Sequence, residues 1–328
     1  MNTKETGKTL HLHGEIDIVV TWVDGKSLCH SGAEGAENCR FRDWGLMGHW
    51  FRCVQECLPW ARRIHVVTNG QVPEGFDESD PKMRLVRHET FMPHDALPTF
   101  NSCAIEAYLD RIPDLAERFV YFNDDMFVLR PLEPEFFFKD GVPCDFALFD
   151  TIRFAPDSAG ELVAQNVKWI NANFTAREIY AKNRRRLLSF ANGWKSAARN
   201  FLYMALVRDW VANFYNPHLP AALTKATYKE VWAKCADVLE RTGKCRYRED
   251  WNVSHWLMRN WQLAAGNYRP RRFAGKYFDA TDARIDEICD AVVHRREALI
   301  CINDVGGLSD FAEGIRRIKD AFERMVRL

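Results

Sequence analysis

Short apolar runs that end in polar residues recur along the chain and predict buried strands. The clearest run is 119–122, which is β-branched and aromatic and leads directly into Asn123, Asp124 and Asp125. Such a run is typical of a strand that is buried on both faces. The same pattern predicts further strands at 16–23, 64–68, 85–88, 145–149 and 299–304.

Helical patterns separate these strands. The apolar and aromatic stretch 46–60 lies between the first two, and a strand, helix, strand order at this spacing indicates a βαβ unit. Further helices are predicted at 101–110, 227–241 and 309–326. We therefore expect an α/β fold with a doubly wound, mostly parallel sheet.

The predicted helix 101–110 has a capping residue, Asn101 or Ser102, at its start. The free backbone N–H groups of its first turn suit a phosphate or a sugar hydroxyl. The competing interpretation is an ordinary capped surface helix.

The composition changes after residue 150. Residues 176–210 contain eight Lys or Arg and two acidic residues, a net charge of +6, interleaved with Phe190, Trp194, Phe201 and Tyr203. Such a basic amphipathic segment can lie on an anionic membrane surface or hold an anionic acceptor chain. The competing interpretation is a helical insertion whose aromatic rings pack on the core while its charges are solvated.

Overall composition excludes some classes of protein. Lys plus Arg equals Asp plus Glu at 45 each, so no global field points to nucleic acid. No apolar run approaches the roughly 20 residues that span a bilayer, and residues 1–15 form a polar tail without the apolar core of a signal peptide. We therefore expect a cytoplasmic protein.

Ten cysteines are scattered without a Cys-x-x-Cys motif, which favours buried free thiols. Cys29, His30 and Cys39 could hold zinc, but a structural zinc site usually needs four ligands.

Asp124 and Asp125 are the strongest candidates for chemistry. They follow a predicted buried strand, and open α/β sheets bind ligands at the carboxyl ends of their strands. Two adjacent carboxylates suit a hard divalent cation such as magnesium, which can bridge to a substrate diphosphate. The competing interpretation is an ordinary turn, because Asn and Asp favour turns.

Four blocks of sequence extend this picture. The first reads Ile-Asp-Ile-Val-Val-Thr-Trp-Val-Asp-Gly at 16–25. The second includes Phe-Arg-Asp at 41–43, Val-Thr-Asn-Gly-Gln-Val-Pro at 67–73, Leu-Pro-Thr-Phe-Asn-Ser-Cys-Ala-Ile-Glu at 97–106 and Tyr-Phe-Asn-Asp-Asp at 121–125. The third runs from His218 through Lys225 to Cys-Arg-Tyr-Arg-Glu-Asp at 245–250, and the fourth is Cys-Ile-Asn-Asp at 301–304. The chain thereby resembles the Stealth family outside residues 150–214. That family comprises bacterial capsular polysaccharide phosphotransferases and the catalytic subunit of the lysosomal-enzyme N-acetylglucosamine-1-phosphotransferase.

The resemblance implies a reaction. Such enzymes move a sugar 1-phosphate, most often N-acetylhexosamine 1-phosphate, from a UDP-sugar to a hydroxyl of a glycan acceptor. UMP is released and a phosphodiester forms, in capsule or exopolysaccharide synthesis. The resemblance also implies Mg²⁺ or Mn²⁺ as cofactor, and a nucleotide-binding fold like that of A-type glycosyltransferases with a helical insertion. Accordingly we divide the chain into the tail at 1–15, a nucleotide-sugar-binding α/β core at 16–150, a basic-aromatic helical insertion at 151–214 and the C-terminal part of the catalytic core at 215–328.

The family motifs also suggest roles for individual residues. His218 matches the family's general base and Arg246 a phosphate-binding arginine, with Lys225 as a further basic group. The predicted metal ligands are Asp124, Asp125, Asn303 and Asp304. The predicted nucleotide and donor contacts are Trp22, Val23, Asp24, Gly25, Arg42, Asp43, Asn101, Ser102 and Glu106.

The chain departs from the family pattern at two places. It reads Arg-Asp-Trp-Gly-Leu-Met at 42–47, where the family usually has Arg-Asp-Asn-Gly-Glu-Leu, and it has Cys245 where Phe is common. Two other functions compete with phosphotransfer. A metal-dependent glycosyltransferase that releases UDP would use the same strand-end acids, and a non-catalytic saccharide-binding protein could keep the fold.

Overall fold

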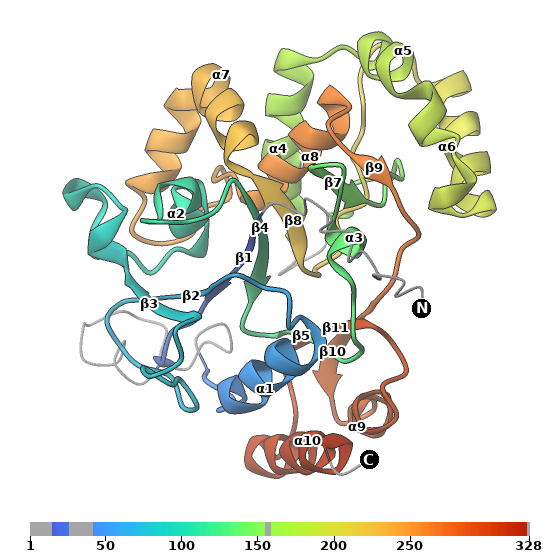
Figure 1. The fold of residues 1–328 in the computed structure, drawn as a ribbon. Coiled ribbons are helices and arrows are strands. Elements are labelled where there is room, and N and C mark those ends of the chain that lie inside the picture. The colour runs from blue at the N-terminus through green and yellow to red at the C-terminus, as the bar shows by residue number, and fades with distance from the viewer. Residues whose placement is uncertain (1–14, 26–41, 155–158, 327–328) are drawn as a thin grey trace, which may run out of the picture.

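A five-stranded sheet forms the centre of the computed structural model, which describes residues 15–25, 42–154 and 159–326 (Figure 1). The strand order is β3-β2-β1-β4-β8. Neighbouring strands are parallel except for β8, which runs antiparallel to β4. The strands are β1 (Ile16–Thr21), β2 (Ile64–Thr68), β3 (Met83–Arg87), β4 (Arg118–Asn123) and β8 (Ala221–Thr224).

This order confirms the predicted doubly wound, mostly parallel sheet. The chain adds β2 and β3 on one side of β1 and then returns to place β4 on the other side. The carboxyl ends of β1 and β4 therefore meet where the winding direction reverses, which is the position at which open α/β sheets bind ligands.

The central strands alternate their side chains between two apolar layers, as period-two geometry requires. Ile18 and Val20 pack in the layer that holds α1 (Met47–Cys57) and α10 (Phe311–Val326). Val19 packs in the opposite layer. The helices there include α2 (Ser102–Ala107), α7 (Lys225–Gly243) and α8 (His255–Ala265).

A second, three-stranded sheet joins the carboxyl end of β4. Its order is β10-β11-β5, with β5 (Met126–Val128) antiparallel to β11 (Leu299–Gly307) and β10 (Lys276–Thr281) parallel to it. The backbone N–H of Ile302 donates to the Asp125 carbonyl at 2.9 Å. This bond holds the fourth sequence block against the Asp124–Asp125 turn. Helix α9 (Ile285–Val293) and helix α10 contact each other beside this sheet.

Smaller elements complete the fold. A third sheet contains β6 (Phe138–Lys139), β7 (Val142–Asp145) and β9 (Arg269–Pro270), and α3 (Pro134–Phe137) precedes it. Short 3-10 helices lie at His88–Thr90, His94–Ala96, Leu109–Arg111 and Phe190–Asn192.

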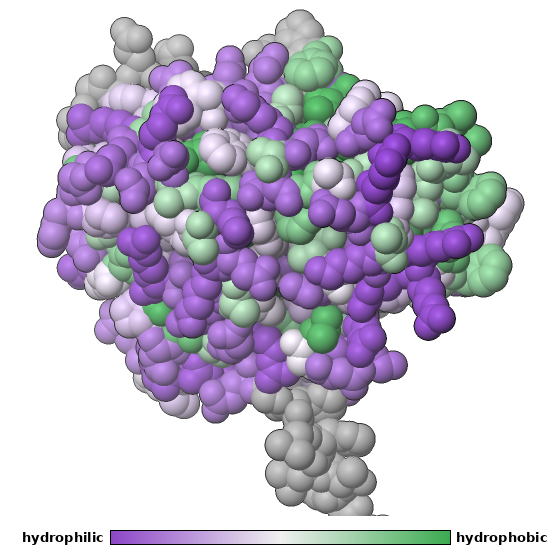
Figure 2. Space-filling view, turned by 90° about the horizontal axis from the view of Figure 1, so that it is seen from above, coloured by the Kyte–Doolittle hydropathy of each residue, from purple (hydrophilic) through white to green (hydrophobic). Residues whose placement is uncertain are grey.

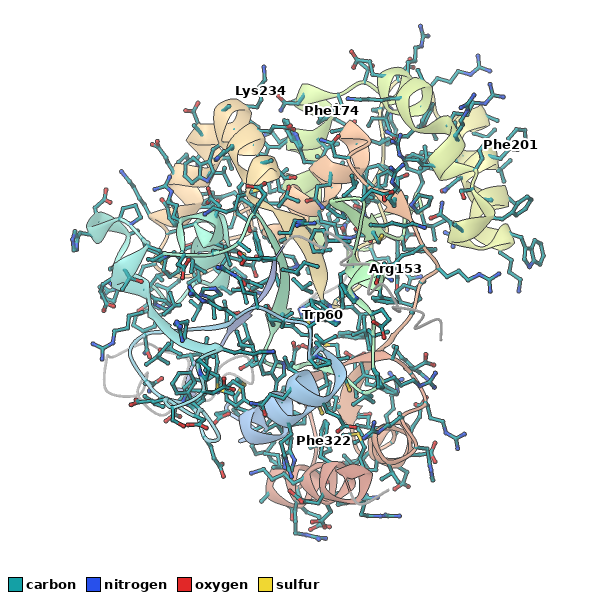
Figure 3. All side chains as sticks on the ribbon, viewed as in Figure 1. Trp60, Arg153, Phe174, Phe201, Lys234 and Phe322 are labelled. Carbon is teal, nitrogen blue, oxygen red and sulfur yellow. The ribbon has the colours of Figure 1, made fainter. Side chains whose placement is uncertain are left out.

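The predicted helical insertion is present as α4 (Gly160–Asn173), α5 (Ala176–Leu187) and α6 (Trp194–Leu206). Tyr203 packs inward and stacks on Phe149 with 4.4 Å between ring centroids. The prediction that all the aromatic rings pack on the core is wrong, because Phe190, Trp194 and Phe201 lie exposed. Figure 2 shows apolar atoms along this edge of the molecule, and Figure 3 shows Phe201 pointing outward from α6.

The strand predicted at 145–149 is wrong. Strand β7 ends at Asp145, and beyond it only Phe149 forms an isolated bridge, with Phe214. The buried side chain of Asn200 replaces a neighbouring strand here, since it donates to the Ala147 carbonyl at 2.9 Å and accepts from the Phe149 N–H at 3.0 Å. Side-chain hydrogen bonds thus satisfy backbone groups that the apolar run alone had suggested would form a ladder.

Some predictions concern residues outside the described ranges, namely the tail at 1–14, the loop at 26–41 and the zinc hypothesis at Cys29, His30 and Cys39. The eight cysteines of the described residues are all free, and six are buried, which confirms that prediction for Cys53, Cys57, Cys103, Cys144, Cys235 and Cys301. No helix in the described ranges is both long enough and apolar enough to cross a bilayer.

A fully buried carboxylate, Asp17, anchors the start of the main sheet. It accepts two hydrogen bonds from Arg62 at 2.8 and 2.7 Å, one from the Ala116 N–H at 2.8 Å, and lies 3.0 Å from His65 Nε2. Burial alone would raise the pKa of Asp17, but the bonds from His65, Arg62 and Ala116 outweigh it and lower the pKa to about 2.

We expect Asp17→Asn to lower the free energy of unfolding by about 3–5 kcal/mol, because it leaves Arg62 without its buried partner. The stabilisation by the ionised carboxylate is complete above the ordinary pKa of 3.8 and is lost as the pH falls toward 2. Urea unfolding between pH 2 and 7 measures both effects. The matched control is the exposed Glu78→Gln, with an expected change within about 0.5 kcal/mol. Equal stability of the two variants would contradict the anchoring role of Asp17.

Candidate active site

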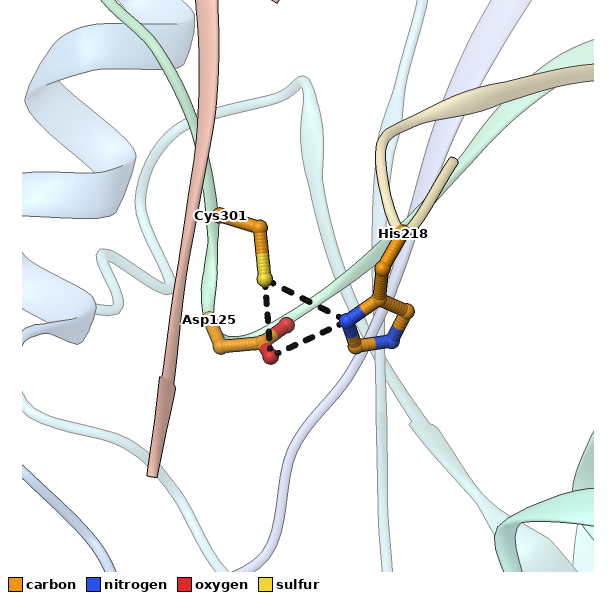
Figure 4. Close-up of side chains that lie close together, drawn as sticks. All are labelled: Asp125, His218 and Cys301. Atoms are coloured by element: carbon orange, nitrogen blue, oxygen red, sulfur yellow. Dashed lines mark hydrogen bonds and ion pairs between the residues drawn. The ribbon is translucent and has the colours of Figure 1, made fainter. Parts of the chain in front are cut away.

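Three side chains from distant parts of the chain meet at the carboxyl end of β4 (Figure 4). Asp125 comes from the turn between β4 and β5, His218 from the segment before β8, and Cys301 from β11. The Cys301 Sγ lies 3.2 Å from the Asp125 Oδ2 and 3.2 Å from the His218 Nδ1, and the same Asp125 and His218 atoms are 3.5 Å apart. The fold therefore brings the predicted metal ligand and the predicted base into one group.

The imidazole of His218 is held on both edges. Asn123 donates from its amide nitrogen to Nε2 at 2.9 Å, so Nε2 is the acceptor and a neutral ring carries its proton on Nδ1, facing Asp125. The rings of Trp256 and Tyr277 lie edge-on to it, with centroids 6.3 and 6.1 Å away. A histidine fixed in one tautomer and one orientation can serve as a base.

The turn carries more negative charge and more free acceptor atoms than the protein satisfies. The Oδ1 atoms of Asn123 and Asp125 are buried without a hydrogen-bond partner. Burial raises the pKa of Asp124 to about 8, and the carboxylates of Asp125 and Asp43 raise it further. Free oxygen acceptors and crowded carboxylates fit a hard divalent cation, and Asp124 and Asp125 could hold one.

Cys301 does not extend this hard donor set, because magnesium and calcium take oxygen ligands. Burial raises the pKa of the Cys301 thiol well above its ordinary value, and the neighbouring Asp125 adds to the rise. The thiol therefore stays protonated and donates to the Asp125 carboxylate.

The period-two geometry of β11 separates the two other predicted metal ligands. Asn303 is two residues from Cys301 and so projects from the same face of the strand. Asp304 projects from the other face, where Arg42 donates to it at 2.9 and 2.7 Å and the Trp44 indole donates at 3.1 Å. The Asp304 carboxylate is thus paired with an arginine in this structure.

The first block and the start of the second block are joined. The Trp22 indole donates to Asp43 Oδ1 at 3.4 Å, and the Gly45 N–H donates to the same atom at 3.0 Å. Asp24 is fixed by Gln71, whose Oε1 accepts from the Asp24 N–H at 2.9 Å. Val23, Asp24 and Gly25 are half-buried in the segment that follows β1. The predicted uridine-binding residues therefore lie on one segment that side-chain hydrogen bonds tie to its neighbours.

Asn101 ties the second block to the third. It caps α2 by accepting from the Cys103 N–H at 3.1 Å. Its amide nitrogen donates to Asn252 at 2.9 Å and to the carbonyls of Cys245 and Tyr247 at 3.1 and 3.3 Å. These bonds span the loop that carries the exposed Arg246.

The other predicted residues of α2 also contact protein groups. Ser102 accepts a hydrogen bond from Arg248 of the same loop. Glu106 is buried and accepts from Tyr121 at 3.2 Å and from the His255 N–H at 2.8 Å, with the His255 ring nitrogen 3.1 Å away. Burial favours a raised pKa for Glu106, but His255 outweighs it and lowers the pKa. Direct contacts of Asn101, Ser102 and Glu106 with a donor sugar stay predictions.

Lys225 is not brought to this group. It follows β8, and Thr224 pairs with Arg118 at the amino end of β4. Its backbone N–H and Nζ contact the carbonyls of Glu117 and Leu115 at 2.9 and 3.4 Å. Five strand residues, about 17 Å, separate this end of β4 from Asn123. In this conformation Lys225 lies too far from Asp125 to share one diphosphate with it.

Sequence reasoning missed several residues of the site. Cys301 was noticed only as part of a motif, and its meeting with His218 required the second sheet. Gln71, His255, Trp256 and Tyr277 gave no signal of their own, since each acts through a contact with a distant segment. Asn123 could have been found, because it directly precedes the two acids.

We expect Asn101→Ala to loosen the loop at 245–252, because three hydrogen bonds to that loop and the cap of α2 disappear together. Amide hydrogen exchange across 245–252 should become at least about tenfold faster, corresponding to a loss of about 1–3 kcal/mol. Ser189→Ala, which removes a cap at another helix, is the control and should leave this loop unchanged. Unaltered exchange in Asn101→Ala would show that other contacts hold the loop.

Comparisons with known proteins agree with the order of the four blocks. Residues 40–144 match the model for conserved region 2 of Stealth proteins. A capsular polysaccharide phosphotransferase, WcwK, from Streptococcus pneumoniae is 32% identical, covering 94% of this chain and 95% of that protein. An exopolysaccharide phosphotransferase, cps2G, from Lactiplantibacillus plantarum is 33% identical over 94% and 93% of the two chains. A receptor polysaccharide phosphotransferase, WefC, from Streptococcus gordonii is 33% identical over 95% and 97%.

Among solved structures, the crystal structure of the galactosyltransferase LgtC in complex with donor and acceptor sugar analogs aligns over 94% of this chain and 95% of that chain. The TM-score is 0.41 and the sequence identity 11%.

Proposed function

This chain belongs to the Stealth family of polysaccharide phosphotransferases, and we propose that it transfers a sugar 1-phosphate from a UDP-sugar to a hydroxyl of a glycan acceptor. It is a phosphotransferase of capsule, exopolysaccharide or receptor polysaccharide synthesis, as its relatives are. The observation that carries the finer proposal is the meeting of His218 with Asp125, beside Asp124, at the switch point of the sheet.

The proposed reaction breaks the phosphoanhydride bond of the donor. The acceptor oxygen attacks the phosphorus that bears the sugar, the oxygen bridging the two phosphorus atoms leaves with UMP, and the sugar–oxygen bond survives. The acceptor hydroxyl gives its proton to the enzyme, and a phosphodiester forms. N-acetylhexosamine is the proposed donor sugar, on the ground of the family resemblance.

His218 takes that proton in this mechanism. Its Nε2 lone pair accepts from the amide of Asn123 in the described conformation, at 2.9 Å. An acceptor hydroxyl that replaces this amide would present its proton to the same lone pair. The Nδ1–H faces Asp125, so the positive charge formed on the ring is stabilised by a carboxylate 3.5 Å away.

Asp125 and Asp124, with Asn303 from the same face of β11 as Cys301, would hold a Mg²⁺ or Mn²⁺ ion. The support is the unpartnered buried Asp125 Oδ1 and the crowding of Asp124 with Asp125 and Asp43. When bound, the ion neutralises charge on the donor diphosphate. Asp304 acts at one remove in this proposal, because Arg42 already engages both of its oxygens.

Arg246 supplies a second positive charge for the phosphates in this proposal. It is exposed on the loop that Asn101 pins to α2, and within the described residues it forms no ion pair with an acidic side chain. Its guanidinium lies 5.7 Å from the Phe100 ring centroid, which gives the side chain a preferred direction. Trp22 and residues 23–25, together with Arg42 and Asp43, form the proposed uridine-binding segment.

We further propose that the enzyme acts in the cytoplasm. All eight cysteines of the described ranges are free thiols, and two of them, Cys53 and Cys57, lie one helical turn apart without forming a disulfide. Free thiols are typical of a reducing compartment.

We expect the purified protein, incubated with UDP-N-acetylglucosamine, magnesium and a panel of glycan acceptors, to release UMP. Nucleotides separated by chromatography give the answer directly. His218→Ala should lower kcat by about 10²- to 10⁴-fold, since the base is lost. His94→Ala, at an exposed histidine, should leave it unchanged. Release of UDP would make the enzyme a glycosyltransferase, and absence of turnover with every UDP-sugar would favour a non-catalytic saccharide-binding protein.

Metal binding can be measured without turnover. The electron paramagnetic resonance signal of free Mn²⁺ reports binding to the protein, and Asp125→Asn should weaken that binding by more than about 100-fold, because a charged oxygen ligand is lost. Asp140→Asn is the matched control. Asp140 is an exposed aspartate with a φ of 54°, a conformation that Asn also adopts readily. Equal affinities for Mn²⁺ in the two variants would remove Asp125 from the metal site.

A further inference from the structure

Large apolar side chains gather on the outer side of the insertion. Of the twelve that lie exposed in the described residues, six fall between 190 and 210, namely Phe190, Trp194, Phe201, Leu202, Leu206 and Trp210. Figure 2 shows this apolar surface along the edge formed by α6, with long hydrophilic side chains projecting beside it. Contiguous exposed apolar surface of this kind marks an interaction site more often than scattered single residues do.

Helix α6 is anchored by one side only. Ala197 and Asn200 are buried, and Asn200 bonds the backbone of Ala147, Phe149 and Leu187. The residues that share the opposite arc at helical spacing include Trp194, Phe201 and Leu202, with exposed fractions of 67%, 62% and 59%. Polar anchors face the protein and apolar residues face outward, so this helix is inverted relative to an ordinary surface helix.

Basic side chains surround the apolar arc. Exposed cations of α5 and α6 are Arg177, Lys182, Arg184, Arg185 and Lys195. Within the described ranges none of the five forms an ion pair with an acidic side chain. Lys195 instead lies 5.6 Å from the ring centroid of Trp194. Residues 176–210 carry a net charge of +6 in a chain whose overall net charge is zero. The positive charge is therefore concentrated beside the apolar arc.

We infer that the outer face of α5 and α6 docks on an anionic lipid bilayer. Trp and Phe side chains insert at the headgroup level, while Lys and Arg reach the lipid phosphates beside them. Two other occupants fit less well. A second copy of the chain would bring two strongly positive faces together, and like charges across an interface disfavour association. An anionic glycan would satisfy the cations but leave Leu202 and Leu206 in water.

This inference goes beyond the proposed function, because binding to a bilayer requires neither donor nor chemistry. The two can therefore fail separately. An enzyme that releases UMP but ignores vesicles would refute only the docking surface, and a protein that binds vesicles without turnover would refute only the proposed reaction.

The test is cosedimentation of the full chain with vesicles of phosphatidylcholine containing about a quarter phosphatidylglycerol. We expect binding at low salt that weakens as the Debye length shortens, and little binding to phosphatidylcholine alone. The triple variant Trp194→Ser, Phe201→Ser, Leu202→Ser should lower the partition coefficient about tenfold or more. Arg184→Glu with Arg185→Glu should have a similar effect.

Lys229→Glu with Lys234→Glu is the matched control. These exposed lysines lie on α7, far from Phe201 in the molecule (Figure 3). The control should bind vesicles as the parent chain does. The inference would be overturned by absence of binding at low salt, by equal binding to vesicles without phosphatidylglycerol, or by an equal loss in the control. A concentration-dependent dimer that the triple variant disperses, without vesicle binding, would assign the face to self-association instead.

Discussion

The corner between two sheets is the constraint on which the rest of this structure depends. Strand β4 ends at Asn123, and after a two-residue turn β5 begins in a different sheet. The Ile302 N–H bonds the Asp125 carbonyl, so β11 locks the turn from the other side. Because both sheets converge there, Asp124 and Asp125 stay at a fixed position beneath His218. A loosely tethered loop could not hold two carboxylates so close together.

The pairing of buried acids distinguishes structure from chemistry. Asp17 has Arg62, Asp304 has Arg42 and Glu106 has His255. Each of these carboxylates is satisfied by the protein itself, as buried charges generally must be. In the described residues Asp124 and Asp125 have no lysine or arginine partner, and their crowding raises the pKa of Asp124 to about 8. The unpaired acids are therefore the ones available to a ligand.

The insertion follows the same logic with apolar side chains. Its inner side is satisfied by Asn192 and Asn200, whose amides bond the backbone of the segment after β7. Its outer side leaves apolar groups in water, a feature that folding alone would not retain at six positions so close in sequence. The core thus determines where α6 lies, and the outer face is left to meet something outside the chain.

The sequence by itself determined the sheet class, the positions of most strands and the two acids, because apolar periodicity and strand-end polar residues are local properties. The four blocks also named His218 without any structure. Tertiary structure decided which residues meet: Cys301 with Asp125, Arg42 with Asp304, Asn101 with the loop at 245–252, and Lys225 with the far end of β4. It also decided that Asn200 would take the place of a strand at 145–149. Contacts between residues that are distant in sequence depend on how elements pack, and no local pattern encodes that packing.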